Sequence, residues 1–358
     1  MRHDLTLEEK IGQLLICGFD GLKPSDEIKG LIKDYHIGGV ILFSRNIKDP
    51  VQTAKLCNSL QKISKTPLFI CVDQEGGKVS RLPKPFTQFA GNAAIGKSNS
   101  VKLAYAFGEI TAKELKAVGV NTNFAPVLDV NTNPDNPVIN ERAFSDNPNS
   151  VSRFGLAVIA GLQDNGAIAC CKHFPGHGDT SLDSHYQLPV VEHKIERLNE
   201  IELLPFKHAA ENDVAAIMTA HVLYKGLDEK YPATLSKKII HDLLRKEIGF
   251  NGLVITDDLE MKAISDNYAV GEAAIGALSA GADIILVCKE HRKQKDAFEA
   301  ILKAVKDKII SEKRIDESIE RITAVKKRYL KDTITDEKKI KDIVGIKEYR
   351  NIASEIIS

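Results

Sequence analysis

Short apolar runs alternate with longer amphipathic stretches along most of this chain. The runs are rich in Val, Ile, Leu, Phe and Cys, and runs of this length predict parallel strands that are buried on both faces. We expect strands at Leu14–Phe19, Gly39–Phe43, Leu68–Asp73, Asn123–Val130, Ile168–His173, Ala215–His221, Leu253–Asp257 and Asp283–Cys288. Eight parallel strands are the number that closes a (β/α)8 barrel.

The stretches between these strands have the apolar period of helices. We expect helices at Asp26–Tyr35, Val51–Ser64, Val101–Val118, Ser150–Asn165, Ile195–Glu211, Lys237–Ile248, Val270–Ala280 and Gln294–Ile310. Residues 1–10 also predict the capped start of an amphipathic helix. Four glycines stand where a helix should stop, as carboxyl-terminal caps: Gly119, Gly166, Gly249 and Gly281.

Polar residues follow the predicted strands, at Asp20, Ser44-Arg45, Asp73, Asp129, Lys172-His173, His221, Asp257-Asp258 and Lys289. In a (β/α)8 barrel the strand ends and the loops after them form the active face. A doubly wound open sheet, the main alternative, would carry a glycine-rich phosphate loop after its first strand, and Gly18-Phe-Asp-Gly21 does not match that pattern. We therefore predict an α/β protein with a TIM barrel.

The composition changes near residue 333. Residues 1–333 contain all the predicted strands and form the predicted catalytic barrel. Residues 334–358 are rich in charge and predict two helices, Glu337–Ile343 and Ile346–Ile357. This tail can pack on the barrel or begin a second domain.

Overall charge argues against partners such as nucleic acid or an acidic membrane surface, because Lys plus Arg and Asp plus Glu both total 49 among the 358 residues. The six cysteines lack the paired spacing of zinc or redox motifs, which predicts buried free thiols in a reducing compartment. The amino terminus lacks the features of a secretory signal, and no apolar run is long enough to span a bilayer. We expect a cytoplasmic monomer that acts on a small molecule.

The loop from Lys172 to Pro189 concentrates titratable groups directly after a predicted strand. Asp183 and His185 are two residues apart, so both side chains lie on the same side of an extended chain and can hydrogen-bond. A carboxylate that orients an imidazole and stabilises its cation makes an acid/base pair. A metal site built from His173, His177, Asp179, Asp183 and His185 is one alternative, and histidines that only satisfy loop backbone groups are another.

More candidate residues follow strands elsewhere in the chain. Asp257 and Asp258 point to opposite faces, so only one can be aimed at a substrate over the barrel mouth. The functional interpretation is a nucleophile or an electrostatic stabiliser, and helix capping by either residue is the alternative. Asp73 and Arg81 flank a glycine turn and can reach a polyhydroxylated ligand, although a plain turn with an ion pair fits as well. Arg142 offers a planar donor pair.

Three segments together resemble the β-N-acetylhexosaminidase branch of glycoside hydrolase family 3, the bacterial NagZ type. The resemblance runs from about Leu5 to Leu330, in the same order, and Lys78 stands where many relatives carry Arg. The segments are Lys172-His-Phe-Pro-Gly-His-Gly-Asp-Thr with Asp183-Ser-His185, Val72-Asp-Gln-Glu-Gly-Gly77, and Ile255-Thr-Asp-Asp-Leu-Glu-Met261.

The resemblance implies a role for each candidate. Asp257 is expected to be the nucleophile of a retaining reaction, with His185 as the general acid/base and Asp183 as its partner. No metal or nucleotide cofactor is implied. The residues expected to hold the sugar in the first subsite are Asp73, Arg81, Arg142, Lys172 and His173.

The expected reaction is removal of terminal β-linked N-acetylglucosamine, with peptidoglycan fragments as the expected substrates. A histidine leaves no anion after it has protonated the leaving oxygen, so an anionic acceptor can approach and phosphorolysis stays an alternative to hydrolysis. A β-glucosidase of the same family and a sugar-binding barrel without activity also stay open at this point. Because the dyad lies on a Gly/Ser-rich loop, we expect His185 to move over the glycosidic oxygen only when substrate is bound.

Overall fold

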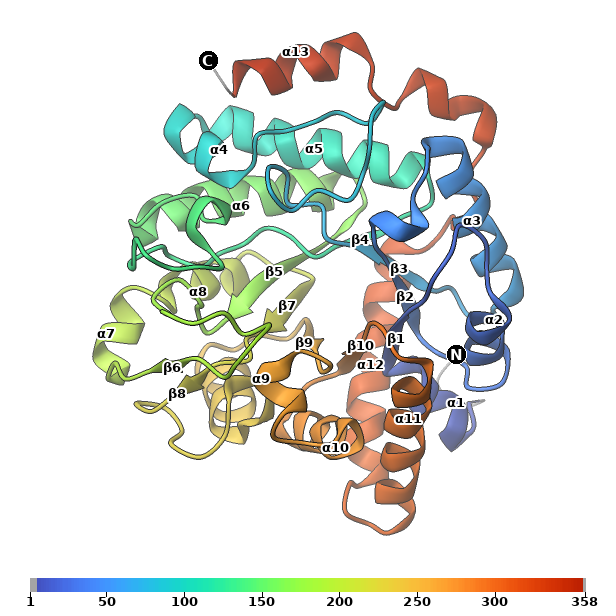
Figure 1. Cartoon of the computed structure of the whole chain (residues 1–358), viewed down its shortest axis with the longest axis vertical. Helices are drawn as coiled ribbons and strands as arrows, with labels where there is room; N and C mark the ends of the chain where they lie inside the picture. Colours follow the sequence, from blue (N-terminus) through green and yellow to red (C-terminus); the bar gives the residue numbers. More distant parts are fainter. Residues whose placement is uncertain (1–4, 357–358) are drawn as a thin grey trace.

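Eight parallel strands close into a barrel in the computed structural model, which describes residues 5–356 (Figure 1). Around the barrel the strands follow the order of the sequence, and the last pairs with the first. The predicted (β/α)8 fold is confirmed. The strands are β1 (Leu15–Gly18), β2 (Gly39–Leu42), β3 (Phe69–Val72), β4 (Thr122–Asn123), β5 (Ile168–Phe174), β7 (Ala216–Thr219), β9 (Leu253–Asp258) and β10 (Ile284–Val287).

One barrel strand is much shorter than its sequence predicts. The expected strand Asn123–Val130 is reduced to the two residues of β4. Pro126 has no N–H to donate to a neighbouring strand, so regular pairing cannot continue through it. The chain still runs beside β5, because Leu128 N donates to the Lys172 carbonyl at 2.6 Å and Lys172 N donates to the Pro126 carbonyl at 3.1 Å.

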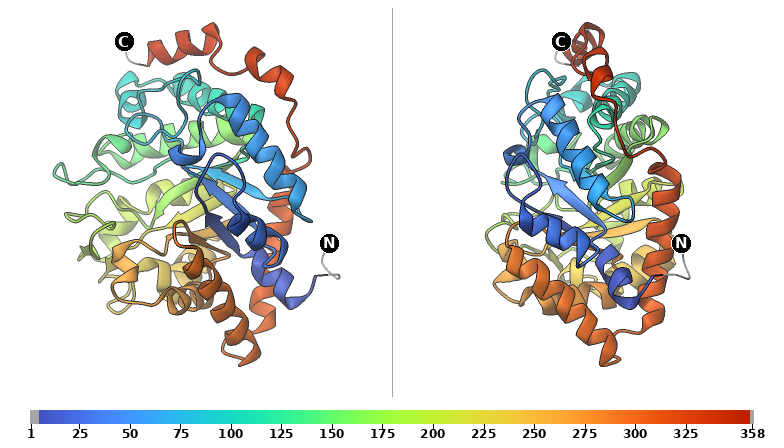
Figure 2. Two further views of the ribbon diagram at one scale, coloured as in Figure 1. Left: turned by 45° about the vertical axis from the view of Figure 1, so that its right-hand side comes forward. Right: turned by 90° about the vertical axis from the view of Figure 1, so that its right-hand side faces the viewer.

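Helices surround the barrel on its outer side (Figure 2). They are α1 (Leu7–Gln13), α2 (Asp26–Lys33), α3 (Pro50–Ile63), α4 (Asn92–Ser98), α5 (Val101–Ala117), α6 (Pro148–Asp164), α7 (Ile195–Glu200), α8 (Leu204–Glu211), α9 (Lys262–Ser265), α10 (Val270–Ala280), α11 (His291–Lys306), α12 (Glu312–Tyr329) and α13 (Lys347–Glu355). Four 3-10 helices are η1 (Ser44–Asn46), η2 (Asn140–Arg142), η3 (Ala233–Leu235) and η5 (Glu337–Asp342), and η4 (Lys238–Glu247) is a π-helix. None of the helices within residues 5–356 is long and apolar enough to cross a membrane.

Most helix ends agree with the sequence signals. Thr6 caps α1 in a capping box with Glu9, as the amino-terminal pattern predicts, although residues 1–4 lie outside the described part. The predicted helix Ile195–Glu211 is instead divided into α7 and α8. Pro205 lies at the start of α8, where a missing N–H is tolerated, whereas the interior of one long helix would not accept it. All four predicted cap glycines have positive φ.

The sequence pattern did not predict α12, an 18-residue helix that packs against α1. Its buried positions form a narrow stripe, Ile315, Ser318, Ile319, Ile322 and Lys326, and most of its other residues are charged. Charged residues make up most of this helix, so its overall hydropathy is low although its apolar positions follow a helical period. Helices α4 and α9 were also not predicted.

The carboxyl-terminal tail packs on the barrel domain, and α13 lies against α5 (Figure 1). Gly345 N donates to Glu114 on α5 at 2.7 Å, and Asn58 on α3 exchanges hydrogen bonds with Thr335. Ile340, Val344, Ala353 and Ile356 join the main hydrophobic core. The two predicted tail helices correspond to η5 and α13, and the last residue of the second prediction, Ile357, lies outside the described residues.

Candidate active site

Four of the predicted site residues lie at the carboxyl ends of three barrel strands. Asp73 directly follows β3, Lys172 and His173 lie near the end of β5, and Asp257 is near the end of β9. All barrel strands are parallel, so these ends open on the same face. The strands therefore bring together side chains that are far apart in the chain.

Two of the predicted site residues, Arg142 and Lys172, meet at a carboxylate that sequence reasoning missed, Glu75. Arg142 Nε and Nη2 each lie 2.9 Å from the Glu75 carboxylate, and Lys172 Nζ lies 2.7 Å from it. Lys172 Nζ also donates to Asp73 at 2.8 Å, and Arg81 Nη2 is 3.7 Å from Asp73. We call Asp73, Glu75, Arg81, Arg142 and Lys172 the ionic cluster.

Burial makes the charges of the ionic cluster strongly dependent on one another. The Glu75 side chain is 2% exposed, and burial alone would raise its pKa, but Lys172 and Arg142 hold the pKa far below its ordinary value. Burial alone would lower the pKa of Lys172, and Asp73 and Glu75 raise it instead. Both groups are therefore charged. The buried Nε of Arg81 has no hydrogen-bond partner within residues 5–356.

His173 forms a second Asp–His pair that the sequence analysis did not identify. Its Nδ1 lies 2.7 Å from Asp129 Oδ2, and Asp129 Oδ1 accepts the backbone N–H groups of His173 at 3.1 Å and His177 at 2.6 Å. Burial would raise the pKa of the fully buried Asp129, and the His173 ring and the His177 amide lower it. With Nδ1 engaged, His173 turns Nε2 toward the guanidinium of Arg142, 3.5 Å away.

Asp257 and Asp258 have opposite electrostatic environments. Burial would raise the pKa of Asp257, but the neighbouring His221 and His173 side chains and the Asp258 amide lower it below its ordinary value. Burial raises the pKa of Asp258 to about 7, with further contributions from Glu260 and Asp257. At neutral pH Asp257 is therefore ionised, whereas Asp258 is about half protonated.

Asp258 instead accepts hydrogen bonds from backbone amides. Its Oδ1 accepts the amide of Glu260 at 3.1 Å and that of Cys288, at the end of β10, at 3.2 Å. The Asp258 carbonyl accepts His221 Nε2 at 2.9 Å, which leaves His221 Nδ1 to interact with Thr234. Sequence reasoning noted His221 only as a strand end, and it is fully buried beside Asp257.

The expected hydrogen bond between Asp183 and His185 is present. His185 Nδ1 and the His185 backbone N–H each lie 2.8 Å from Asp183 Oδ1, so the dyad geometry is formed within three residues. The His185 side chain is 58% exposed. Within residues 5–356, no hydrogen bond or ion pair connects the dyad to Asp257 or to the ionic cluster. The hydrogen-bonded pair is therefore formed, with His185 exposed to solvent and Asp183 half-buried.

The candidate metal ligands of the histidine-rich loop do not converge. His173 pairs with Asp129, His185 pairs with Asp183, and Asp179 pairs with His193 at 2.7 Å. Among residues 5–356, no group of three or more His, Cys, Asp or Glu side chains is arranged to hold a metal ion.

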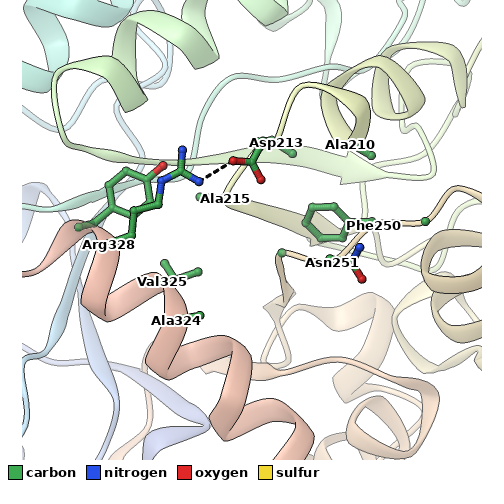
Figure 3. Close-up of a pocket in the computed structure, with 12 residues that line it drawn as sticks. Ala210, Asp213, Ala215, Phe250, Asn251, Ala324, Val325 and Arg328 are labelled. Atoms are coloured by element: carbon green, nitrogen blue, oxygen red, sulfur yellow. Dashed lines mark hydrogen bonds and ion pairs between the residues drawn. The ribbon is translucent and has the colours of Figure 1, made fainter.

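A cavity of about 250 Å³ lies at the opposite, amino-terminal end of the barrel (Figure 3). Its lining includes Ala215 and Gly252, which precede β7 and β9, and Phe250. Arg328 Nη1 and Asp213 Oδ2 form an ion pair of 2.6 Å at this cavity. The active face of a TIM barrel is at the carboxyl ends of its strands, so this cavity is separate from the candidate site.

Comparison with known proteins identifies relatives of the whole barrel. The family model described as "Glycosyl hydrolase family 3 N terminal domain" matches residues 6–325. A β-hexosaminidase A of Pseudoalteromonas piscicida is 38% identical over an alignment of 369 residues. The alignment covers 90% of this chain and 61% of that protein. The chain thus spans less than two thirds of the length of this relative.

Two solved structures of enzymes resemble this chain over almost its whole length. A glycoside hydrolase family 3 β-N-acetylglucosaminidase from Paenibacillus sp. str. FPU-7 has a TM-score of 0.93 and 45% identity, over 98% of this chain and 68% of that one. A β-glucoside phosphorylase has a TM-score of 0.91 and 25% identity, over 99% of this chain and 65% of that one.

Proposed function

Because this chain belongs to glycosyl hydrolase family 3, through the N-terminal domain of that family, we propose that it is a retaining exo-β-N-acetylglucosaminidase. The observation that carries the proposal is the meeting, at one end of the barrel, of the ionised Asp257, the ionic cluster and the loop with the Asp183/His185 pair. A nucleophilic carboxylate, a set of polar groups for a sugar ring and an acid/base group are what a retaining glycosidase needs.

The ionic cluster and His173 are proposed to hold the sugar in the first subsite. Asp73 offers carboxylate acceptors, and Arg81, Lys172 and Arg142 offer donors for hydroxyl oxygens. Glu75 is almost wholly enclosed and makes three close contacts to cations, so we assign it to orienting Arg142 and Lys172 rather than to contacting sugar. Preorganised donors of this kind bind a ring in one orientation and lose little entropy on doing so.

Asp257 is proposed to attack the anomeric carbon. Its low pKa keeps it an anion at neutral pH, as a carboxylate nucleophile requires. As the bond from Asp257 to the anomeric carbon forms, the bond to the glycosidic oxygen breaks. The electron pair of the broken bond goes to that oxygen, which then needs a proton.

His185 is proposed to supply that proton from Nε2, while Asp183 on Nδ1 stabilises the imidazolium. The neutral ring then removes a proton from water, which attacks the same carbon, releases Asp257 and gives a product of retained configuration. Because the ring is exposed and not joined to Asp257, the loop has to move for this step. Loop movement on substrate binding is therefore part of the proposal.

We further propose that the substrates are peptidoglycan fragments and that the protein works in the cytoplasm as a monomer. The names of the relatives support β-linked N-acetylhexosaminides as substrates, and the choice of peptidoglycan fragments rests on the resemblance described in the sequence analysis. All six cysteines are free and buried, which is compatible with a reducing compartment. No metal or nucleotide cofactor enters the proposed reaction.

Phosphorolysis is the second candidate. It is favoured by the likeness to a β-glucoside phosphorylase and by the histidine acid/base, which is uncharged after the first proton transfer and does not repel phosphate. Product analysis decides between the two: hydrolysis releases free N-acetylglucosamine with or without phosphate, whereas phosphorolysis releases the sugar 1-phosphate. Turnover of glucosides in preference to N-acetylglucosaminides would instead indicate a β-glucosidase.

Two variants test the residue roles. Asp257→Ala is expected to reduce turnover by about a thousandfold or more, because it removes the nucleophile. His185→Ala is expected to reduce kcat/KM much more for alkyl than for nitrophenyl N-acetylglucosaminides, because good leaving groups need less protonation. Equal losses on the two substrates would contradict the acid role of His185. Tight sugar binding by the wild-type protein without turnover of any glycoside would indicate a binding protein.

A further inference from the structure

One buried residue interrupts the exposed segment that carries the dyad. Residues 181–188 are exposed or half-buried except for Ser184, which is 2% exposed. Ser184 stands between Asp183 and His185 in the chain. The Asp183 carbonyl accepts the backbone N–H groups of Tyr186 at 3.0 Å and Gln187 at 3.1 Å, so the segment forms a turn, which buries Ser184 and leaves His185 exposed.

The Ser184 side chain is held by a buried histidine, His177. Ser184 Oγ lies 3.0 Å from His177 Nε2, and His177 Nδ1 lies 2.7 Å from Thr180 Oγ1. The Thr180 hydroxyl donates to the His177 carbonyl at 3.1 Å, so His177 Nδ1–H is the donor toward Thr180. Burial lowers the pKa of His177 to about 4, so the ring is neutral and Nε2 accepts the Ser184 hydroxyl proton.

The Ser184 backbone is held from the other side of the site. Ala263 N donates to the Ser184 carbonyl at 3.2 Å, and Ala263 is in α9, which follows the strand that carries Asp257. His177 in turn donates its backbone N–H to Asp129, the partner of His173. Ser184 thus joins the loop of the proposed acid/base group both to the proposed nucleophile strand and to the proposed sugar subsite.

We propose that Ser184, held by His177, is a positioning residue that fixes the point about which the Asp183/His185 dyad turns toward the glycosidic oxygen. This inference rests on the proposed function of His185. A loop attached at one buried residue can swing its exposed side chains inward while the distance from that residue to Asp257 stays set. Without the attachment, fewer conformations of the loop would place His185 at the glycosidic oxygen. The rate of protonation would then fall more than the affinity for substrate.

The test compares kcat/KM for a nitrophenyl and an alkyl β-N-acetylglucosaminide. In Ser184→Ala we expect kcat/KM to fall about 10- to 100-fold for the alkyl glycoside, which needs protonation, and by less than about threefold for the nitrophenyl glycoside. Ser181→Ala, at an exposed serine of the same loop, is the matched control and should leave both values unchanged. Ser184→Thr keeps the hydroxyl and should keep the wild-type ratio of the two substrates.

Thermal unfolding of each variant separates positioning from loss of the folded state, because a smaller folded fraction lowers both kcat/KM values equally. Equal losses on the two substrates in folded Ser184→Ala would overturn the inference, as would the same substrate split in Ser184→Thr or Ser181→Ala. The wild-type protein distinguishes the two levels of the argument. If the wild-type protein turned over neither glycoside, the proposed function would be wrong. If it turned over both, and Ser184→Ala lowered kcat/KM equally for the two or not at all, only the proposed role of Ser184 would be wrong.

Discussion

Replacing Lys326 by Met is expected to stabilise the protein at pH 6 and to destabilise it slightly at pH 10. Lys326 lies on α12 and is 6% exposed at the amino-terminal end of the barrel. Its Nζ donates to Gln13 Oε1 at 2.7 Å and to the Gly38 carbonyl at 3.1 Å, and it lies 4.8 Å from the centre of the Phe69 ring. No carboxylate within residues 5–356 forms an ion pair with it.

Burial determines the sign of the effect. It lowers the pKa of Lys326 from its ordinary value of 10.5 to about 7. Between pH 7 and pH 10.5 the unfolded chain therefore binds a proton that the folded protein does not, and the free energy of unfolding of the wild type rises with pH. The cost of burying this amine is complete below pH 7 and disappears as the pH approaches 10.5.

The change in the free energy of unfolding follows from the pKa shift of Lys326 and from the two hydrogen bonds that its amine makes. A shift of about 3.5 units corresponds to about 5 kcal/mol when the amine is charged. Met loses two hydrogen bonds worth about 2 kcal/mol together. It leaves no acceptor unpaired, because Gln13 Oε1 also accepts from Thr66 at 3.2 Å and the Gly38 carbonyl also accepts from Phe69 N at 3.0 Å. We expect Lys326→Met to be about 3 kcal/mol more stable at pH 6 and about 1 kcal/mol less stable at pH 10.

Urea unfolding at one-unit steps from pH 6 to pH 10 measures this difference. Lys327→Met, at the exposed neighbouring position on the same helix, is the matched control and should change the free energy of unfolding by less than about 0.5 kcal/mol at every pH. A Lys326→Met difference that stays constant over this range would refute the reasoning, because the amine would then have the same pKa in the folded and unfolded states.

The remaining predictions concern buried carboxylates near the site. Glu75→Gln keeps the side-chain shape but leaves Arg142 and Lys172 short of a counter-charge, so urea unfolding should show a loss of about 3–5 kcal/mol, together with a higher KM. Asp258→Asn keeps the Oδ1 acceptor and removes a carboxyl whose pKa is raised to about 7, so the stability of this variant relative to wild type should rise from pH 4 to pH 7. A flat pH dependence of that difference would be inconsistent with a raised pKa.

Local patterns in the chain accounted for the strands and for the dyad. A buried strand is recognisable because its own residues are apolar, and all eight barrel strands were predicted within a few residues except β4, which is much shorter. The predicted hydrogen bond between Asp183 and His185 is present because the two residues are close in the chain, although the segment is a turn and not the extended chain that the prediction assumed. Helix α12 escaped prediction because charged residues make up most of it, and the buried Lys326 stands next to Lys327 and Arg328 in the chain.

The partners of Glu75 and His173 could not be predicted in the same way. Glu75 and Arg142 are 67 positions apart, and Asp129 and His173 are 44 apart, on loops and strand ends that only barrel closure brings together. The motif Val72-Asp-Gln-Glu-Gly-Gly77 did contain Glu75, but its two acidic residues gave no indication of which would face a ligand and which would hold the cations.

From its order of residues alone, this chain settles which segments are strands, where polar groups follow them, and which histidine has an aspartate beside it, because these depend on neighbours in the sequence. Closure of the barrel determines which of the carboxyl groups at the site are ionised. Asp257 and Asp258 are adjacent and chemically identical, yet the folded protein lowers the pKa of one and raises that of the other. The difference comes from burial and from His221, His173 and Glu260 around them, and a carboxylate acquires such surroundings only when distant strands pack together.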